Sequence, residues 1–185
     1  MFKKLKSKKA FTLVELIVTI ALFSIFSLGT VSVVVPVLAI YNNAIKLSDA
    51  NLIVANVLNT VETELQFAVP GQDIEIDGGA VLRFKGKYGA TEIMASPDTA
   101  SPSPTPGRGY LMMKRGGSDA VYKPYYDEKY YKNNTVEIHF VNDDDRIDPA
   151  DNIIKVTVDI FDNNDVRITT VERYMKPFAA AYISP

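Results

Sequence analysis

The hydrophobic and polar positions of this chain follow three successive patterns. Residues 11–41 form an almost unbroken apolar run, in which Glu15 is the one ionisable side chain before the terminal tyrosine. Residues 42–69 place apolar side chains at three- and four-residue spacing, which is the pattern of an amphipathic helix. After residue 70 the apolar runs are short and alternate with a period of two, which is typical of half-buried strands.

The first two patterns predict one continuous helix from about residue 12 to about residue 68, which Pro70 and Gly71 end. Its first half is long enough to span a membrane, which takes about 20 apolar residues. Its second half has one apolar face, which we expect to pack on a sheet of its own domain.

A weak point in this helix is predicted around Gly29 and Pro36, because both residues and the β-branched run between them lower helix propensity. In lipid the helix should persist, since every backbone polar group must be satisfied internally. We therefore expect a bend or local unwinding at Gly29 and Pro36 only once the helix leaves lipid for a protein assembly.

Residues 70–185 predict a β-rich head domain. A hairpin is expected around Gly78 and Gly79, and residues 96–109, rich in Pro and Ser, are expected to form an exposed loop. Five tyrosines within residues 122–131 are interpreted as half-buried side chains at a sheet edge or a subunit contact. An antiparallel meander packed on the helix gives an α+β fold. Its strands are predicted at residues 73–76, 80–85, 91–95, 110–114, 135–141, 153–161 and 166–174.

Composition and charge narrow the function. Five of the 20 basic residues lie in the first ten positions, which leaves 15 against 22 acidic residues, so we expect no direct nucleic-acid binding. The sequence contains no cysteine, and its one histidine, His139, is predicted to face away from the core. Neither a catalytic triad nor a phosphate-binding glycine loop is recognisable, so an enzyme is not expected.

The N-terminus carries the most specific signal. The segment Lys8-Lys9-Ala10-Phe11-Thr12-Leu13-Val14-Glu15-Leu16 follows a basic run and opens the apolar helix. It resembles the leader of type IV prepilins and type II secretion pseudopilins. The resemblance implies cleavage by a prepilin peptidase between Ala10 and Phe11, N-methylation of Phe11, and a glutamate at the fifth mature position, which is Glu15.

This sequence departs from the family pattern at two positions. The residue before the cut is usually glycine but here is Ala10, and the helix-bending proline sits at mature position 26, which is Pro36. Glu15 nonetheless favours a filament over a plain anchor, because a carboxylate in hydrocarbon costs several kcal/mol. The resemblance implies that Glu15 pairs with the new α-amine of Phe11 on a neighbouring subunit.

An acidic segment lies between two predicted strands. Its carboxylates suit Ca²⁺, but the EF-hand pattern fails, and a solvated loop is the favoured interpretation because acidic residues are common in a turn between two strands. Some pseudopilins carry a calcium site in this domain. The candidate ligands are Asp143, Asp145, Asp148 and Asp151.

These observations predict a structural subunit, favoured as a minor pilin, of a type IV pilus-like filament. It would have a leader at residues 1–10, a membrane or filament-core helix at 11–41, an amphipathic helix at 42–69 and a head at 70–185. Its partners would be other pilins, the prepilin peptidase and an inner-membrane assembly platform. It would pass from the cytoplasmic membrane to a cell-surface filament. The alternatives are a pseudopilin of a type II secretion or DNA-uptake system, and an uncleaved single-pass anchor carrying a surface binding domain.

Overall fold

The computed structural model describes residues 12–69, 74–117, 119–142, 153–177 and 183–184. Helix α1 runs from Leu13 to Gln66, close to the predicted bounds, and 54 residues give it a length of about 80 Å. The chain divides into two compact units, Met1–Ile45 and Lys46–Pro185. The first contains the apolar half of α1, and the second contains the rest of α1 and the strands.

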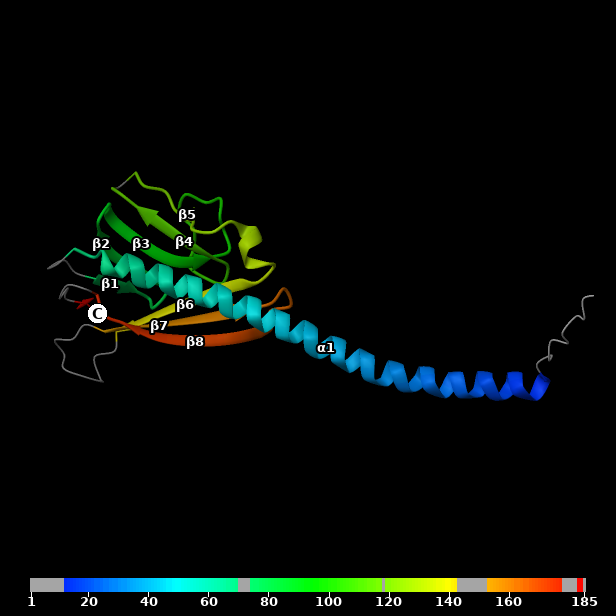
Figure 1. The fold of residues 1–185 in the computed structure, drawn as a ribbon. Helices are drawn as coiled ribbons and strands as arrows, with labels where there is room; N and C mark the ends of the chain where they lie inside the picture. Colours follow the sequence, from blue (N-terminus) through cyan, green and yellow to red (C-terminus); the bar gives the residue numbers. More distant parts are fainter. Residues whose placement is uncertain (1–11, 70–73, 118, 143–152, 178–182, 185) are drawn as a thin grey trace, which may run out of the picture. The chain divides into compact units, whose positions relative to one another are not determined.

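Within the described residues the strands form two sheets (Figure 1). The six-stranded sheet has the order β5-β4-β3-β2-β1-β9, and the three-stranded sheet has the order β6-β7-β8. The first comprises β1 (Ile74–Asp77), β2 (Val81–Gly86), β3 (Gly89–Ser96), β4 (Tyr110–Arg115), β5 (Lys123–Pro124) and β9 (Ile183–Ser184). The second comprises β6 (Thr135–Asn142), β7 (Ile154–Phe161) and β8 (Arg167–Met175), and a short 3₁₀ helix η1 (Glu128–Tyr131) precedes it.

All seven predicted strands are present, but their arrangement differs from one continuous antiparallel meander. Successive strands are antiparallel neighbours in each sheet, whereas β9 pairs with β1 in parallel. The two sheets meet through backbone bonds from Phe140 N–H to Gly79 O and between Gly109 and Val136, each at 2.8 Å. The period-two pattern indicates which side chains face the core, but it does not state which strand lies beside which.

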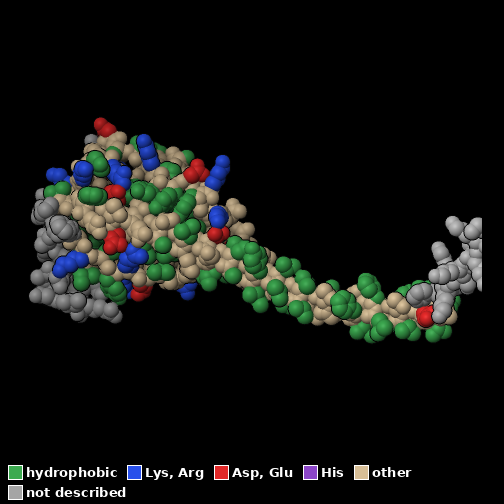
Figure 2. Space-filling model, viewed as in Figure 1, with side chains coloured by type: hydrophobic (Ala, Val, Ile, Leu, Met, Phe, Trp, Pro, Cys, Tyr) green, Lys and Arg blue, Asp and Glu red, His purple; other side chains and the backbone are tan. Residues whose placement is uncertain are grey.

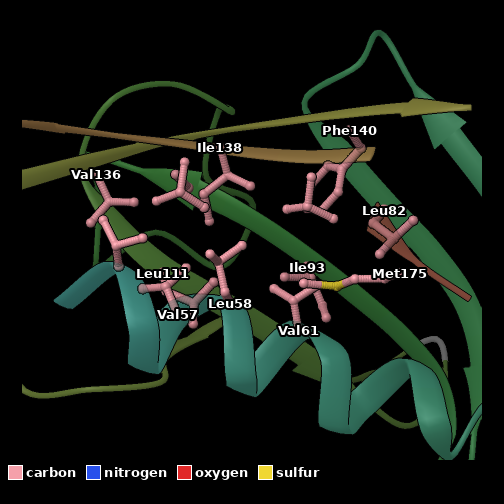
Figure 3. Packing of buried hydrophobic residues seen from close by; sticks show 14 of the residues in the cluster. Val57, Leu58, Val61, Leu82, Ile93, Leu111, Val136, Ile138, Phe140 and Met175 are labelled. Carbon is pink, nitrogen blue, oxygen red and sulfur yellow. The ribbon is translucent and has the colours of Figure 1, made fainter. Parts of the chain in front are cut away.

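The core lies between the second half of α1 and the inner faces of both sheets (Figure 3). Val57 and Leu58 of the helix are buried against side chains of both sheets, including Leu111 and Ile138. The predicted inward set of β6 is confirmed, because Val136, Ile138 and Phe140 are each at most 2% exposed. The domain is therefore α+β and pilin-like.

The hairpin predicted around Gly78 and Gly79 is confirmed, and a second tight turn joins β7 to β8. Gly78 and Gly79 have φ of +56° and +71°, so they supply the left-handed residues of the β1–β2 turn. Asp162 accepts backbone N–H bonds from Asn164 and Val166 at 2.8 and 3.0 Å, which closes the β7–β8 turn. These two bonds lower the pKa of Asp162.

The Pro- and Ser-rich loop is irregular as predicted, but it is held at its C-terminal end. Gly107 N–H donates to Ala95 O at 2.9 Å, and the Arg108 guanidinium lies 3.4 Å from the ring centroid of Phe161. Gly109 cannot be replaced without movement, because a Cβ there would lie 2.0 Å from Ser96 O. The loop is thereby attached to the three-stranded sheet.

Candidate functional site

Glu15 forms a capping box with Thr12 at the start of α1. Thr12 N–H donates to Glu15 Oε2 at 2.9 Å, and Thr12 Oγ1 donates to the same oxygen at 3.0 Å. The return bond runs from Glu15 N–H to Thr12 Oγ1 at 3.3 Å. This reciprocal arrangement satisfies backbone donors that a helix N-terminus otherwise leaves unpaired. The T-x-x-E spacing of Thr12 and Glu15 is the sequence signature from which this cap could have been predicted.

The apolar side chains of the first half of α1 are exposed in the described part of the chain. Its large hydrophobic side chains from Leu13 to Tyr41 are 46–75% exposed, and Figure 2 shows them along this part of the helix. The helix is long and apolar enough to cross a membrane. This surface must be covered by lipid or by other protein, because an apolar patch of such size is not left in water.

Polar side chains in this segment, such as those of Thr19 and Ser24, bond back to the helix. Thr19 Oγ1 donates to Glu15 O at 2.6 Å, and Ser24 Oγ donates to Ile20 O at 2.8 Å. Their hydroxyls are satisfied within the helix, so they do not oppose insertion into lipid.

The helix is continuous through Gly29 and Pro36. Pro36 has no N–H, so it cannot donate to the carbonyl of Ser32 one turn earlier. The helix is thus unbroken at these residues, as expected in lipid. The bend expected at these residues in a filament stays a prediction.

Two groups of predicted site residues lie outside the described part of the chain. They are the processing residues Ala10 and Phe11, and the candidate calcium ligands Asp143, Asp145, Asp148 and Asp151. Within the described residues, no group of three or more His, Cys, Asp or Glu side chains could hold a metal ion. His139 is exposed, as predicted, and its Nε2 lies 3.5 Å from Glu137 Oε1.

Tyrosines of the 122–131 segment attach it to the helix. Thr60 Oγ1 lies 2.7 Å from the Tyr126 hydroxyl, and Asn56 donates to the Tyr130 hydroxyl. The Tyr126 and Tyr130 rings stack with centroids 4.5 Å apart. Both are half-buried, as expected, but Tyr131 is completely buried. They contact the helix of their own subunit, whereas a sheet edge or a subunit contact was expected.

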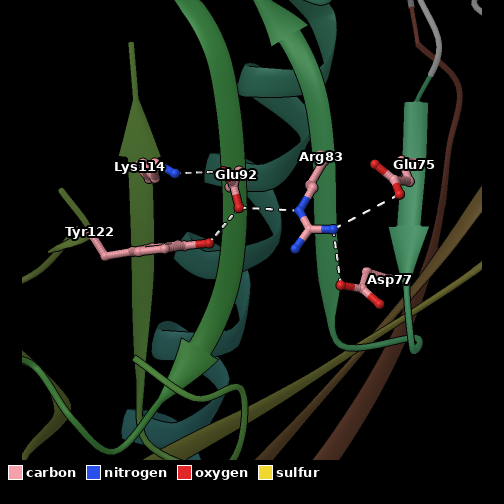
Figure 4. Close-up of polar contacts among 6 residues, drawn as sticks. All are labelled: Glu75, Asp77, Arg83, Glu92, Lys114 and Tyr122. Atoms are coloured by element: carbon pink, nitrogen blue, oxygen red, sulfur yellow. Dashed lines mark hydrogen bonds and ion pairs between the residues drawn. The ribbon is translucent and has the colours of Figure 1, made fainter. Parts of the chain in front are cut away.

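A half-buried carboxylate on the outer face of the six-stranded sheet was not predicted. Glu92 accepts hydrogen bonds from Tyr122 Oη at 2.5 Å, Lys114 Nζ at 2.9 Å and Arg83 Nε at 3.2 Å (Figure 4). Burial alone would raise the pKa of Glu92, but these three donors outweigh burial and lower it. Burial also raises the pKa of Tyr122, which stays protonated. The cluster holds the chain before β5 against the sheet.

An apolar helix with one acid near its start, continued by an amphipathic half that packs on β-sheets, defines a pilin-like subunit. Residues 5–31 match the prokaryotic N-terminal methylation motif, the prepilin-type cleavage and methylation motif of type IV pilins and pseudopilins. No curated protein and no solved structure matches the chain. The motif thus supports a type IV pilin- or pseudopilin-like processed subunit with a membrane-anchoring helix, and it indicates a structural role.

Proposed function

We propose that this chain is a structural subunit of a type IV pilus-like filament. Prepilin peptidase would cut between Ala10 and Phe11, and Phe11 would then be N-methylated. The matured helix would leave the membrane through an inner-membrane assembly platform and pack with other pilins in a cell-surface filament. The methylation motif at residues 5–31 carries this proposal.

The capping geometry supports a role for Glu15 in assembly. Thr12 occupies only Oε2, and no hydrogen bond to Oε1 is found among the described residues. Oε1 is therefore available to the Phe11 α-amine of a neighbouring subunit while the cap stays intact. In a dry helix bundle this charge pair would be strong, and it would penalise a wrong axial register.

Two features favour a minor subunit over the main one. Ala10 replaces the usual glycine before the cut, which we expect to slow processing, and the loop at residues 96–109 is large and irregular. A pseudopilin of a type II secretion or DNA-uptake system would share the same motif and helix. Counting this subunit against other pilins in purified filaments, by quantitative mass spectrometry, separates the minor role from the major one.

Intact-mass spectrometry of the protein from its own cells tests the proposal. A chain that begins with N-methylated Phe11 supports the filament subunit, and Ala10→Gly is expected to increase its yield. A chain that keeps Met1 would contradict processing and favour an uncleaved single-pass anchor that carries a surface binding domain.

A further inference from the structure

An exposed aromatic and basic surface lies where α1 ends. The Phe67 and Tyr88 side chains are 52% and 67% exposed, and Lys87 Nζ lies 6.0 and 5.5 Å from their ring centroids. Lys85 is nearby, because its carbonyl accepts from Val69 N–H at 2.8 Å. Exposed aromatic rings beside cations are typical of interface anchors. We call this the basic surface, defined by Phe67, Lys85, Lys87, Tyr88 and Lys123.

Two cavities that share Arg115 lie between the helix end and Lys123. Arg115 forms an ion pair with Glu64 and borders two cavities of about 230 and 600 Å³. The smaller cavity reaches Lys87, and the larger one reaches Lys123 and Asp119. Among the described residues Lys85, Lys87 and Lys123 form no ion pair, so the surface is net basic in a chain whose part after residue 10 is net acidic.

Carboxylates gather on a different part of the same unit, beside η1. Asp98, Asp127 and Glu128 are exposed, and none forms an ion pair among the described residues. Glu128 Oε1 accepts from Thr99 Oγ1 at 3.0 Å, which places the Asp98 turn beside η1. Lys129 is the neighbouring cation, so the group stays net acidic. We call Asp98, Asp127 and Glu128 the acidic surface.

The two surfaces lie at different levels along α1. The basic surface includes Phe67, the residue just after the helix, while Tyr130 of the η1 segment accepts a hydrogen bond from Asn56 within the helix. Phe67 stands eleven positions after Asn56, which corresponds to a rise of roughly 16 Å along the helix axis. Lys85 and Lys87 therefore lie too far from the acidic surface to neutralise it within one subunit, and Lys123, four residues before Asp127, forms no ion pair with it among the described residues. Both surfaces thus remain available to a second subunit stacked along a filament.

We propose that the basic surface docks on the acidic surface of a second copy of this chain in the filament. This inference rests on the proposed filament function and adds a head-to-head contact to the helix packing. The contact is heterologous, because it uses two different patches, and repeated heterologous contacts generate helical filaments. This contact requires two copies of the chain to be neighbours in the filament. A minor subunit meets that requirement only where its copies cluster.

Charge reversal tests the contact in cells that assemble the full-length chain. The triple variant Lys85→Glu, Lys87→Glu, Lys123→Glu is expected to lower its amount in sheared filaments roughly tenfold, because three attractive pairs become repulsive. Combining it with Asp98→Lys and Glu128→Lys should restore assembly. A matched control reverses Lys155 and Glu172, which pair with each other at 3.3 Å on β7 and β8.

Cysteine cross-linking locates the contact directly. The sequence has no cysteine, so Lys87→Cys and Glu128→Cys would introduce the only thiols. Oxidised filaments should give a ladder of disulfide-linked multimers, and a pair with Glu172→Cys in place of Glu128→Cys should not. A bond within one subunit is not expected, because the offset of roughly 16 Å along α1 exceeds the separation of about 7 Å that a disulfide allows between Cα atoms.

The outcomes separate this inference from the proposed function. Filaments without a ladder, or a triple variant that assembles normally, would overturn the docking contact and leave the filament subunit standing. Wild-type protein that never enters sheared filaments would overturn both. A third outcome would assign the basic surface to a polyanion instead. In that case the wild-type protein binds a single-stranded oligonucleotide, the triple variant does not, and the cysteine pair gives no ladder of multimers.

Discussion

The hydroxyl of Tyr131 accepts a hydrogen bond from the backbone N–H of Leu111 at 3.0 Å, inside the core. Strand β5 covers only two residues, so the N–H of Leu111 on β4 has no strand partner on that side. The Tyr131 hydroxyl supplies the hydrogen-bond acceptor that a longer β5 would otherwise provide. Burial raises the pKa of Tyr131, so the phenol remains neutral in this position.

Replacing Tyr131 with Phe should destabilise the head by about 1–3 kcal/mol. The ring would still fill the core, but the buried N–H of Leu111 would lose its acceptor. Chemical denaturation monitored by circular dichroism measures the change. Tyr88→Phe is the matched control, because Tyr88 is 67% exposed, and its stability should stay at the wild-type value. Equal stability of Tyr131→Phe and wild type would contradict the role of this hydrogen bond.

The sequence predicted the elements of the fold better than their arrangement. The alternation of Val136, Ile138 and Phe140 identified the inner face of β6, because period-two burial is a local property of a strand. The division into two sheets and the parallel β1–β9 pair depend on long-range contacts that no local pattern encodes. The buried position of Tyr131 is likewise a long-range feature, because its hydroxyl binds the Leu111 N–H beyond the end of β5.

The candidate site was predicted in part. Glu15 was identified from sequence because a lone acid in an apolar run is conspicuous, and the methylation motif covers this segment. Its bond to Thr12 was missed, since a charged residue there was considered only as a partner for another subunit. Glu92 could not be found, because its three donors come from separate parts of the head.

Glu15→Ala should abolish entry into filaments while the leader is still removed. The variant loses the carboxylate proposed to pair with the Phe11 amine of a neighbour, so that amine would be buried unpaired. Immunoblots of sheared filaments and of membranes report assembly and processing separately. Normal amounts of correctly processed Glu15→Ala protein in filaments would show that the segment is only a tether.

Thr12→Val separates this assembly role from helix capping. It removes the Thr12 Oγ1 bonds to Glu15 but keeps the Glu15 charge. If Glu15 acts between subunits, Thr12→Val should assemble at close to the wild-type level, because losing part of a cap costs only about 1 kcal/mol. Equal loss of assembly in both variants would instead assign the effect to the cap.

The acidic segment between β6 and β7 is a candidate Ca²⁺ site, although a solvated loop is the favoured interpretation. If the segment binds the ion, titration calorimetry at millimolar Ca²⁺ shows saturable binding, which Asp145→Asn combined with Asp151→Asn should remove, since carboxylates are the preferred ligands. Glu172→Gln, on β8, is the control and should bind as the wild type does. Absence of binding heat at millimolar Ca²⁺ would leave the segment as a solvated loop.

The carboxylate of Glu92 should make the stability of the head depend on pH. Its pKa in the folded protein is lower than the ordinary value of 4.5, because three donors stabilise the charged form. Its contribution is therefore fully present above pH 4.5 and is lost as pH falls through the folded-state pKa. Glu92→Gln should lower the urea midpoint near neutral pH, and its curve should approach that of the wild type in acid.

Glu75→Gln is the matched control for this effect. Its side chain is 58% exposed and lies 3.9 Å from Arg83, so solvent screens its charge. Its midpoint should follow that of the wild type at every pH. A constant difference between Glu92→Gln and wild type across the acid range would contradict the charge argument, because only loss of packing or of a neutral hydrogen bond is independent of pH.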